Sequence, residues 1–169
     1  MQVRRGDSCA RFGTPGDDLK EEKPRPCYEL AHYMDAARRF RQRYNATTIA
    51  LATDSHEVVE EAVRDFGHEF SFRFIDYDRK RNEGKKRTLA EQSHPGNFIE
   101  IRDREHPGSV NHALIYKSFM ADMNLLRHAD MVVGTSGSVA SRLFLLIVAG
   151  DRGRVPPYVM LDKPFGGPF

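Results

Sequence analysis

Short apolar segments alternate with longer amphipathic segments along most of this sequence, and this alternation limits the possible folds more than any other feature. The apolar segments are typical of buried strands. They cover residues 1–5, 47–52, 70–75, 129–133 and 158–161. The amphipathic segments have helical spacing and cover residues 27–44, 57–66, 110–126 and 139–149. The pattern predicts an α/β fold with a parallel sheet and helices on both faces.

The length and composition indicate one soluble globular domain. The 169 residues suffice for a single hydrophobic core, so we predict one domain over residues 1–169. Residues 6–26 and 76–108 are polar and rich in glycine and proline, and we expect long loops there. The net charge of +2 does not favour a nucleic-acid partner. The basic runs at 79–81 and 85–87 are interpreted as solvated loop residues in preference to a polyanion site.

The sequence carries no targeting signal of its own. Its longest apolar run, Leu143–Ala149, is far too short to span a bilayer, and no apolar segment follows Met1. We expect the chain to be the C-terminal piece of a longer protein, with any membrane anchor upstream. Cys9 and Cys27 bracket one polar loop, so a single disulfide could close this loop in an oxidising compartment. Two thiols do not make a metal site, and none is predicted.

Polar side chains gather where the predicted strands end. Arg4 and Arg5 follow the first strand, with Asp7 close behind. Asp54 ends the second strand, and Gly134–Ser138 forms a turn of small residues before the last long helix. Ligands of parallel α/β sheets bind at the carboxyl ends of the strands. We therefore expect these groups to share one edge of the sheet.

The arginines and the turn both suit an anionic ligand. A guanidinium binds phosphate through two parallel hydrogen bonds and stabilises a departing diphosphate without a metal. One of Arg4 and Arg5 can face the ligand while the other packs inward or pairs with Asp7. The alternative is a surface pair bridged to Asp7. The turn offers backbone N–H groups and the hydroxyls of Ser136 and Ser138 to an anion, and the alternative is an ordinary capped helix start.

Two carboxylates have candidate ligand roles. Asp54 can orient a ligand hydroxyl, hold a nearby arginine or, alternatively, cap the helix that follows it. Asp122 lies on an otherwise apolar helix face, where a carboxylate would suit a purine with two donors, such as guanine. Its alternative is a partly exposed helix residue. Four histidines share no spacing pattern and are interpreted as structural or surface residues: His56, His68, His112 and His128.

Three segments together resemble the α1,6-fucosyltransferase family and the related rhizobial and protein O-fucosyltransferases. Gln2–Asp7 is similar to the family's first motif, His-Val-Arg-Arg-x-Asp, except at the histidine. Leu51–Asp54 matches its Leu-Ala-Thr-Asp. Ala121–Arg142 is similar to a third block, and the matching positions are Asp122, Ala129, Asp130, Thr135, Ser138 and Arg142. The resemblance spans about residues 2–145, with the blocks in the family's order.

The resemblance implies a Rossmann-like GDP-fucose-binding domain, one half of a glycosyltransferase-B fold. It implies inverting, metal-independent transfer of fucose, without a cofactor, to a glycan or glycoprotein acceptor, the N-glycan core being favoured. It also implies the Golgi lumen. Arg4 would bind the β-phosphate with help from Ser138, Asp122 would recognise guanine, and Asp7 and Asp54 would be needed for activity. The implied donor site comprises Gln2, Arg4, Arg5, Asp122, Thr135, Ser136 and Ser138.

Two positions depart from the family's pattern and leave other hypotheses open. Gln2 replaces a histidine that contacts the nucleotide, and Phe12 stands at about the place of the family's candidate base. Possible substitutes for that base follow in the same loop: Asp17, Asp18, Glu21 and Glu22. A second hypothesis is therefore a non-catalytic GDP-fucose-binding remnant. A third is a helix-rich interaction module whose motifs are coincidental.

Overall fold

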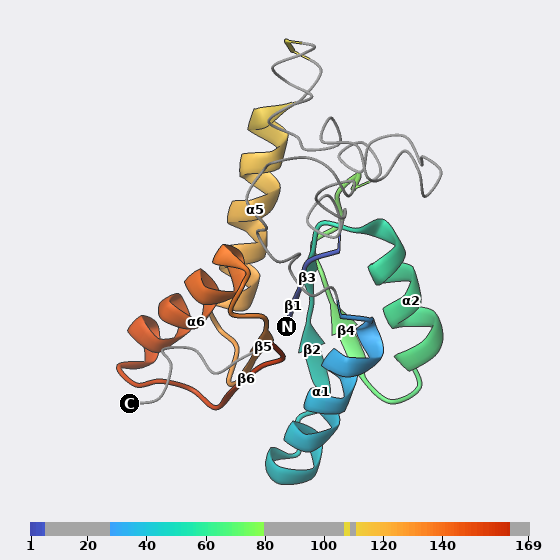
Figure 1. Cartoon of the computed structure of the whole chain (residues 1–169), viewed down its shortest axis with the longest axis vertical. Coiled ribbons are helices and arrows are strands. Elements are labelled where there is room, and N and C mark those ends of the chain that lie inside the picture. Colours follow the sequence, from blue (N-terminus) through green and yellow to red (C-terminus); the bar gives the residue numbers. More distant parts are fainter. Residues whose placement is uncertain (6–27, 80–106, 109–110, 163–169) are drawn as a thin grey trace, which may run out of the picture.

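The computed structural model describes residues 1–5, 28–79, 107–108 and 111–162 (Figure 1). In these ranges it shows a mixed α/β fold with four helices and three pairs of short parallel strands. The helices are α1 (Leu30–Tyr44), α2 (His56–Phe66), α5 (His112–Leu126) and α6 (Val139–Arg152). The strands are β1 (Gln2–Val3), β2 (Thr48–Ala50), β3 (Ala52–Thr53), β4 (Ser71–Arg73), β5 (Val132–Gly134) and β6 (Tyr158–Met160).

The strands follow one another across the molecule in a defined order. β1 pairs with β3, β2 with β4, and β5 with β6, always in parallel. β2 and β3 are pieces of one extended segment separated by Leu51, whose N–H donates to the Arg73 carbonyl at 2.7 Å. β5 lies beside β1, on the side away from β3 (Figure 1). The succession is therefore β4, β2/β3, β1, β5, β6, and over the described residues it closes into no barrel.

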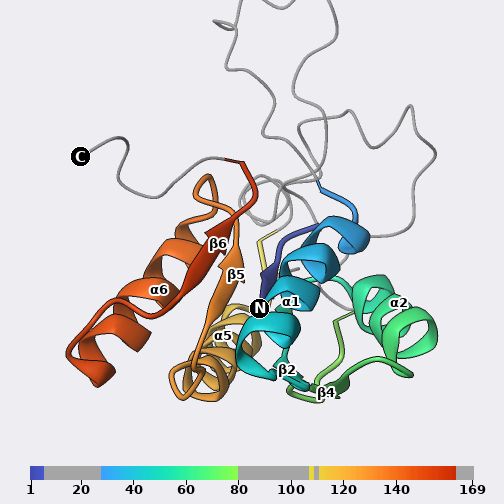
Figure 2. The same ribbon diagram turned by 90° about the horizontal axis from the view of Figure 1, so that it is seen from below.

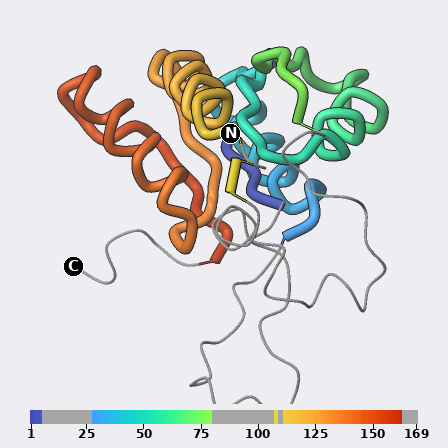
Figure 3. Tube along the Cα trace, turned by 90° about the horizontal axis from the view of Figure 1, so that it is seen from above, coloured from blue at the N-terminus to red at the C-terminus, as the bar shows by residue number. Residues whose placement is uncertain are grey.

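Two helices cover each face of the strands. Side chains alternate along a strand, so Ile49 and Leu51 face α1 and α2, whereas Ala50 and Ala52 face α5 and α6. Figures 2 and 3 show the two pairs of helices on opposite sides. In the described part of the chain, no helix is long and apolar enough to cross a bilayer.

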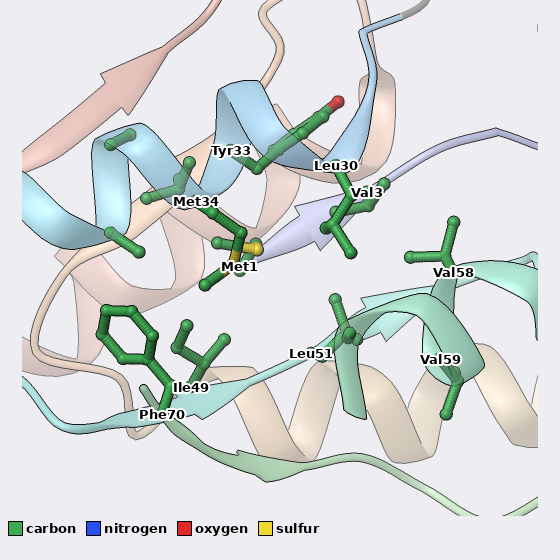
Figure 4. Packing of buried hydrophobic residues seen from close by; sticks show 14 residues of the cluster. Met1, Val3, Leu30, Tyr33, Met34, Ile49, Leu51, Val58, Val59 and Phe70 are labelled. Atoms are coloured by element: carbon green, nitrogen blue, oxygen red, sulfur yellow. The ribbon is translucent and has the colours of Figure 1, made fainter. Parts of the chain in front are cut away.

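The larger hydrophobic cluster fixes β1 against α1. Leu30 and Met34 are fully buried and pack with Val3 and Leu51 (Figure 4). Burying a side chain of this size contributes roughly 1.5–3 kcal/mol. On the opposite face, Met123, Leu126 and Phe144 join α5 to α6. Both clusters pack against the strands and so fix the positions of the residues that follow their carboxyl ends.

The expected mixed α/β arrangement with parallel strands is confirmed, but several boundaries differ. The strand predicted over 47–52 is divided at Leu51 and continues to Thr53. The last long helix continues to Arg152, where Gly153, at φ 64°, ends it. Ser55 occupies the N-cap of α2, yet its side chain makes no capping hydrogen bond. Asp7, Phe12, both cysteines and most of the 76–108 segment lie outside the described residues.

Candidate functional site

The carboxyl ends of β1 and β3 bring two arginines next to Asp54. The Arg5 N–H donates to Asp54 Oδ1 at 3.1 Å, and Arg4 Nε lies 3.8 Å from Asp54 Oδ2. Of the roles considered for Asp54, the structure shows it holding the arginine segment. The Arg5 guanidinium turns to Glu61 of α2, at 2.7 Å. The Arg4 side chain is 40% exposed, so a ligand can reach its guanidinium more readily than that of Arg5.

Gln2 ties β1 to the start of α6. Its Oε1 accepts hydrogen bonds from the hydroxyls of Ser138, at 3.2 Å, and Ser141, at 2.5 Å. All three residues are buried. Ser138 is the N-cap of α6, where its side chain accepts from the Ser141 N–H at 3.4 Å. The turn is therefore a capped helix start, and Gln2 is engaged within the protein.

The turn before α6 holds an internal carboxylate. Asp162, just after β6, accepts from the Ser136 N–H at 2.7 Å, the Ser136 hydroxyl at 2.9 Å and the Gly137 N–H at 2.7 Å. Burial alone would raise the pKa of Asp162, but these hydrogen bonds outweigh it and hold the pKa below its usual value. The turn is thus able to bind an oxyanion, and in this structure that oxyanion is Asp162.

Tyr33 of α1 connects the two parts of this edge. It is almost fully buried, and its hydroxyl group is close enough to Thr135, Arg5 and Asp162 for each of them to affect its pKa. Burial raises the pKa of Tyr33 to about 12, so it remains a neutral phenol at physiological pH. The groups predicted to share one edge after β1, β3 and β5 are therefore neighbours around α1 and the turn.

A second group of polar residues lies deeper, between the segment after β4 and α5. Asp122 is 5% exposed, so the partly exposed alternative is wrong. The Tyr77 hydroxyl lies 3.4 Å from Asp122 Oδ2 and 3.0 Å from the Thr53 carbonyl. Asp122 Oδ1 is buried and has no hydrogen-bond partner among the described residues.

Arg79 supports this group from beside Tyr77. It is 2% exposed, and its guanidinium donates to the carbonyls of Thr53 at 3.1 Å and Ile75 at 2.8 Å. It also lies 4.0 Å above the centre of the Tyr77 ring. The interpretation of residues 79–81 as solvated loop is therefore wrong for Arg79, because stacking and carbonyl contacts bury its charge.

Burial dominates the protonation of Asp122. It raises the pKa of this carboxyl to about 7, against smaller opposing effects of the Arg79 charge and the Tyr77 hydrogen bond. Burial likewise raises the pKa of Tyr77 to about 12, with the Asp122 charge adding to the effect. Asp122 is therefore close to half-ionised at neutral pH, which is unusual for an aspartate.

Sequence reasoning missed several residues of the site. Tyr77 and Arg79 stand in a polar, basic stretch that was expected to be a loop. The signal that could have indicated their burial is the pair of aromatic residues before the first basic run, Phe74 and Tyr77. Asp162 carried no signal beyond its place just after the last predicted strand. Over the described residues, no group of three or more histidine, cysteine or acidic side chains is arranged to hold a metal ion.

No protein-family model matches the chain. No curated protein sequence matches it significantly. Any function must therefore be argued from the site's residues and from the motifs in the sequence.

Proposed function

We propose that this chain is the nucleotide-binding domain of a fucosyltransferase that uses GDP-fucose, built as a Rossmann-like half of a glycosyltransferase-B fold. The strand succession β4, β2/β3, β1, β5, β6 supports this, because it is the order of a doubly wound sheet with the first strand at its centre. Such sheets bind nucleotides beside the first strand, where the strand order reverses. Arg4 and the turn before α6 follow the two strands at that point.

The buried Asp122 carboxyl group, with one oxygen unpaired within the described residues, is the observation that carries the proposal. A buried carboxylate oxygen without a donor is costly, and native proteins seldom leave one unpaired. Oδ1 of Asp122 is such an atom within the described residues. A ligand that presents N–H donors would complete its hydrogen bonding. Guanine has two adjacent donors, the ring N1–H and the 2-amino group, and the motif resemblance gives Asp122 the same role.

Arg4 is proposed to bind the β-phosphate, with Asp54 holding the arginine in position. In the reaction, an acceptor hydroxyl oxygen bonds to the anomeric carbon of fucose as the bond from that carbon to the phosphate oxygen breaks. GDP leaves with the electron pair, and the hydroxyl proton passes to a carboxylate base. A preorganised guanidinium stabilises the charge that develops on the diphosphate. The favoured acceptor is the N-glycan core, in the Golgi lumen.

The position of Asp162 constrains where the diphosphate can bind. The Ser136 and Gly137 amides already hold a carboxylate, so a phosphate would have to displace it to use them. We therefore attribute the diphosphate contact to Arg4. Ser136 and Thr135 then act by shaping the turn, through Asp162 and Tyr33 respectively.

Gln2 favours a second candidate function, a domain that binds GDP-fucose without transferring fucose. Its side chain oxygen is buried between Ser138 and Ser141. It is therefore engaged in structure at the position where the family has a histidine that contacts the nucleotide. This leaves a nucleotide site with one contact fewer than the family's.

Incubating the chain with GDP-fucose and an N-glycan acceptor separates the two candidates. Release of GDP together with fucosylated glycan supports the enzyme, and Asp54→Asn should slow it by loosening Arg4. Saturable binding of GDP-fucose without turnover supports the binding domain. Failure to bind GDP-fucose at all rules out both.

A further inference from the structure

We propose that Tyr77 and Arg79 are positioning residues that control the protonation of Asp122, so that guanine binding is coupled to release of a proton from this carboxyl group. The inference rests on the proposed function, because it concerns the base-recognition end of the same site. Neither residue belongs to the motifs that suggested the family. The three side chains are linked by hydrogen bonds, stacking and charge, and all are largely buried.

The Tyr77 hydroxyl has one proton and two acceptors. It lies 3.0 Å from the Thr53 carbonyl and 3.4 Å from Asp122 Oδ2. A phenol donates only once, and the shorter contact is to the carbonyl. The second contact brings the same hydroxyl to Asp122 Oδ2, where the phenol can donate only while the carboxyl group is ionised and accepts. Tyr77 therefore stabilises the ionised form of Asp122 against the effect of burial.

Arg79 fixes Tyr77 and biases Asp122 without bonding to it. Within the described residues its guanidinium donates to the backbone carbonyls of Thr53, Tyr77 and Ile75 and stacks on the Tyr77 ring. Its charge favours the ionised form of Asp122. Over the described residues, Arg79 and Tyr77 are the groups that act on the Asp122 pKa, and Asp54 acts on Tyr77. Helix α6 packs against α5, the helix that carries Asp122, and presents apolar side chains at this contact.

Two protonation states then match two different bases. Ionised Asp122 offers two acceptors, which suit the paired N–H donors of guanine. Neutral Asp122 offers one donor and one acceptor, which suit the ring nitrogen and amino group of adenine. Guanine binding therefore expels the proton to solvent, and the preference for GDP over ADP should increase as the pH rises through 7. Burial that raises the Asp122 pKa to about 7 places this change near neutrality.

The first test uses the protein without nucleotide. Carbon-detected NMR follows the side-chain carboxyl signals between pH 4 and 9, and the Asp122 signal is identified by its loss in Asp122→Asn. Tyr77→Phe removes a donor from the ionised carboxylate, so the Asp122 midpoint should move upward. Tyr116→Phe is the matched control, because Tyr116 lies on α5, the helix that carries Asp122, and is 65% exposed. An unchanged midpoint in Tyr77→Phe overturns the inference.

The second test measures GDP and ADP affinity between pH 6 and 8.5. We expect Tyr77→Phe to weaken GDP binding roughly tenfold at pH 7, the effect of losing a hydrogen bond to a charged group. The ratio of wild-type to variant affinity should shrink as pH rises, and the ligand's own titration cancels in that ratio. A ratio that does not change with pH contradicts the inference. If neither protein binds GDP, the proposed function fails, whereas the NMR titration still decides the role of Tyr77.

Discussion

Replacing Asp122 by asparagine should change how the stability of this protein depends on pH. In the folded chain, burial raises the Asp122 pKa from 3.8 to about 7. In the unfolded chain it returns to its ordinary value. Between these two values the folded state binds a proton that the unfolded state does not, so the free energy of unfolding falls as pH rises. Asparagine has the same shape and does not titrate.

The size of the effect follows from the difference between the two pKa values. A change of one pKa unit corresponds to about 1.4 kcal/mol, so this carboxyl costs the folded wild type about 4 kcal/mol at pH 8. The cost should be nearly absent at pH 4. The asparagine variant should therefore gain stability relative to wild type by up to about 4 kcal/mol across this range. That is a large part of the stability of a typical domain.

Urea unfolding of both proteins at pH 4, 5, 6, 7 and 8 measures this difference. Effects of every other titrating group cancel in the comparison. Asp35→Asn is a suitable control, because the Asp35 side chain is 66% exposed and its pair with Arg38 lies at the surface. A difference between Asp122→Asn and wild type that stays constant from pH 4 to 8 would refute the burial of this carboxyl and its role in recognition.

Other substitutions test the packing of the turn before α6. Asp162→Asn should destabilise the protein by about 1–3 kcal/mol near pH 7, because the amides of Ser136 and Gly137 lose a charged acceptor. This loss of stability should shrink below about pH 4, since the Asp162 pKa is lowered in the folded state. Gly134→Ala should cost about 1–3 kcal/mol, because a Cβ there would lie 2.5 Å from Ser141 Oγ. Gly150 lies in α6, where an added Cβ would meet no atom within 4 Å. Gly150→Ala should therefore stabilise the protein by about 0.5–1 kcal/mol in the same unfolding assay. Equal effects of the two glycine substitutions would contradict the packing described.

Local sequence patterns predicted the elements well because each pattern depends on a few neighbouring residues. The apolar spacing of 112–126 gives a helix in any setting that offers a core to pack against. The sequence also drew attention to the polar residues at strand ends, because parallel strands bring their carboxyl ends to one edge. Arg4, Asp54 and the turn before α6 were singled out for this reason.

The deeper part of the site depends on contacts that no local pattern encodes. Arg79 opens a basic run, which usually indicates a solvated loop, but here it is covered by aromatic rings and bonded to carbonyls from two segments. Asp162 looks like an ordinary loop acid until β5 and β6 pair and bring it to Ser136. One of Arg4 and Arg5 was expected to pack inward or to pair with Asp7, which lies outside the described residues, and the Arg5 guanidinium donates to Glu61 of α2, which no local pattern indicated.

Calorimetric titration with GDP tests the central proposal most directly. We predict micromolar binding, with Arg4→Ala weakening it by about tenfold or more, since a guanidinium–phosphate contact is a strong charge-assisted hydrogen bond. Arg39→Ala, which removes an exposed arginine of α1, should leave the affinity unchanged. Absence of GDP binding at millimolar concentration, or equal affinities in wild type and Arg4→Ala, would contradict the account.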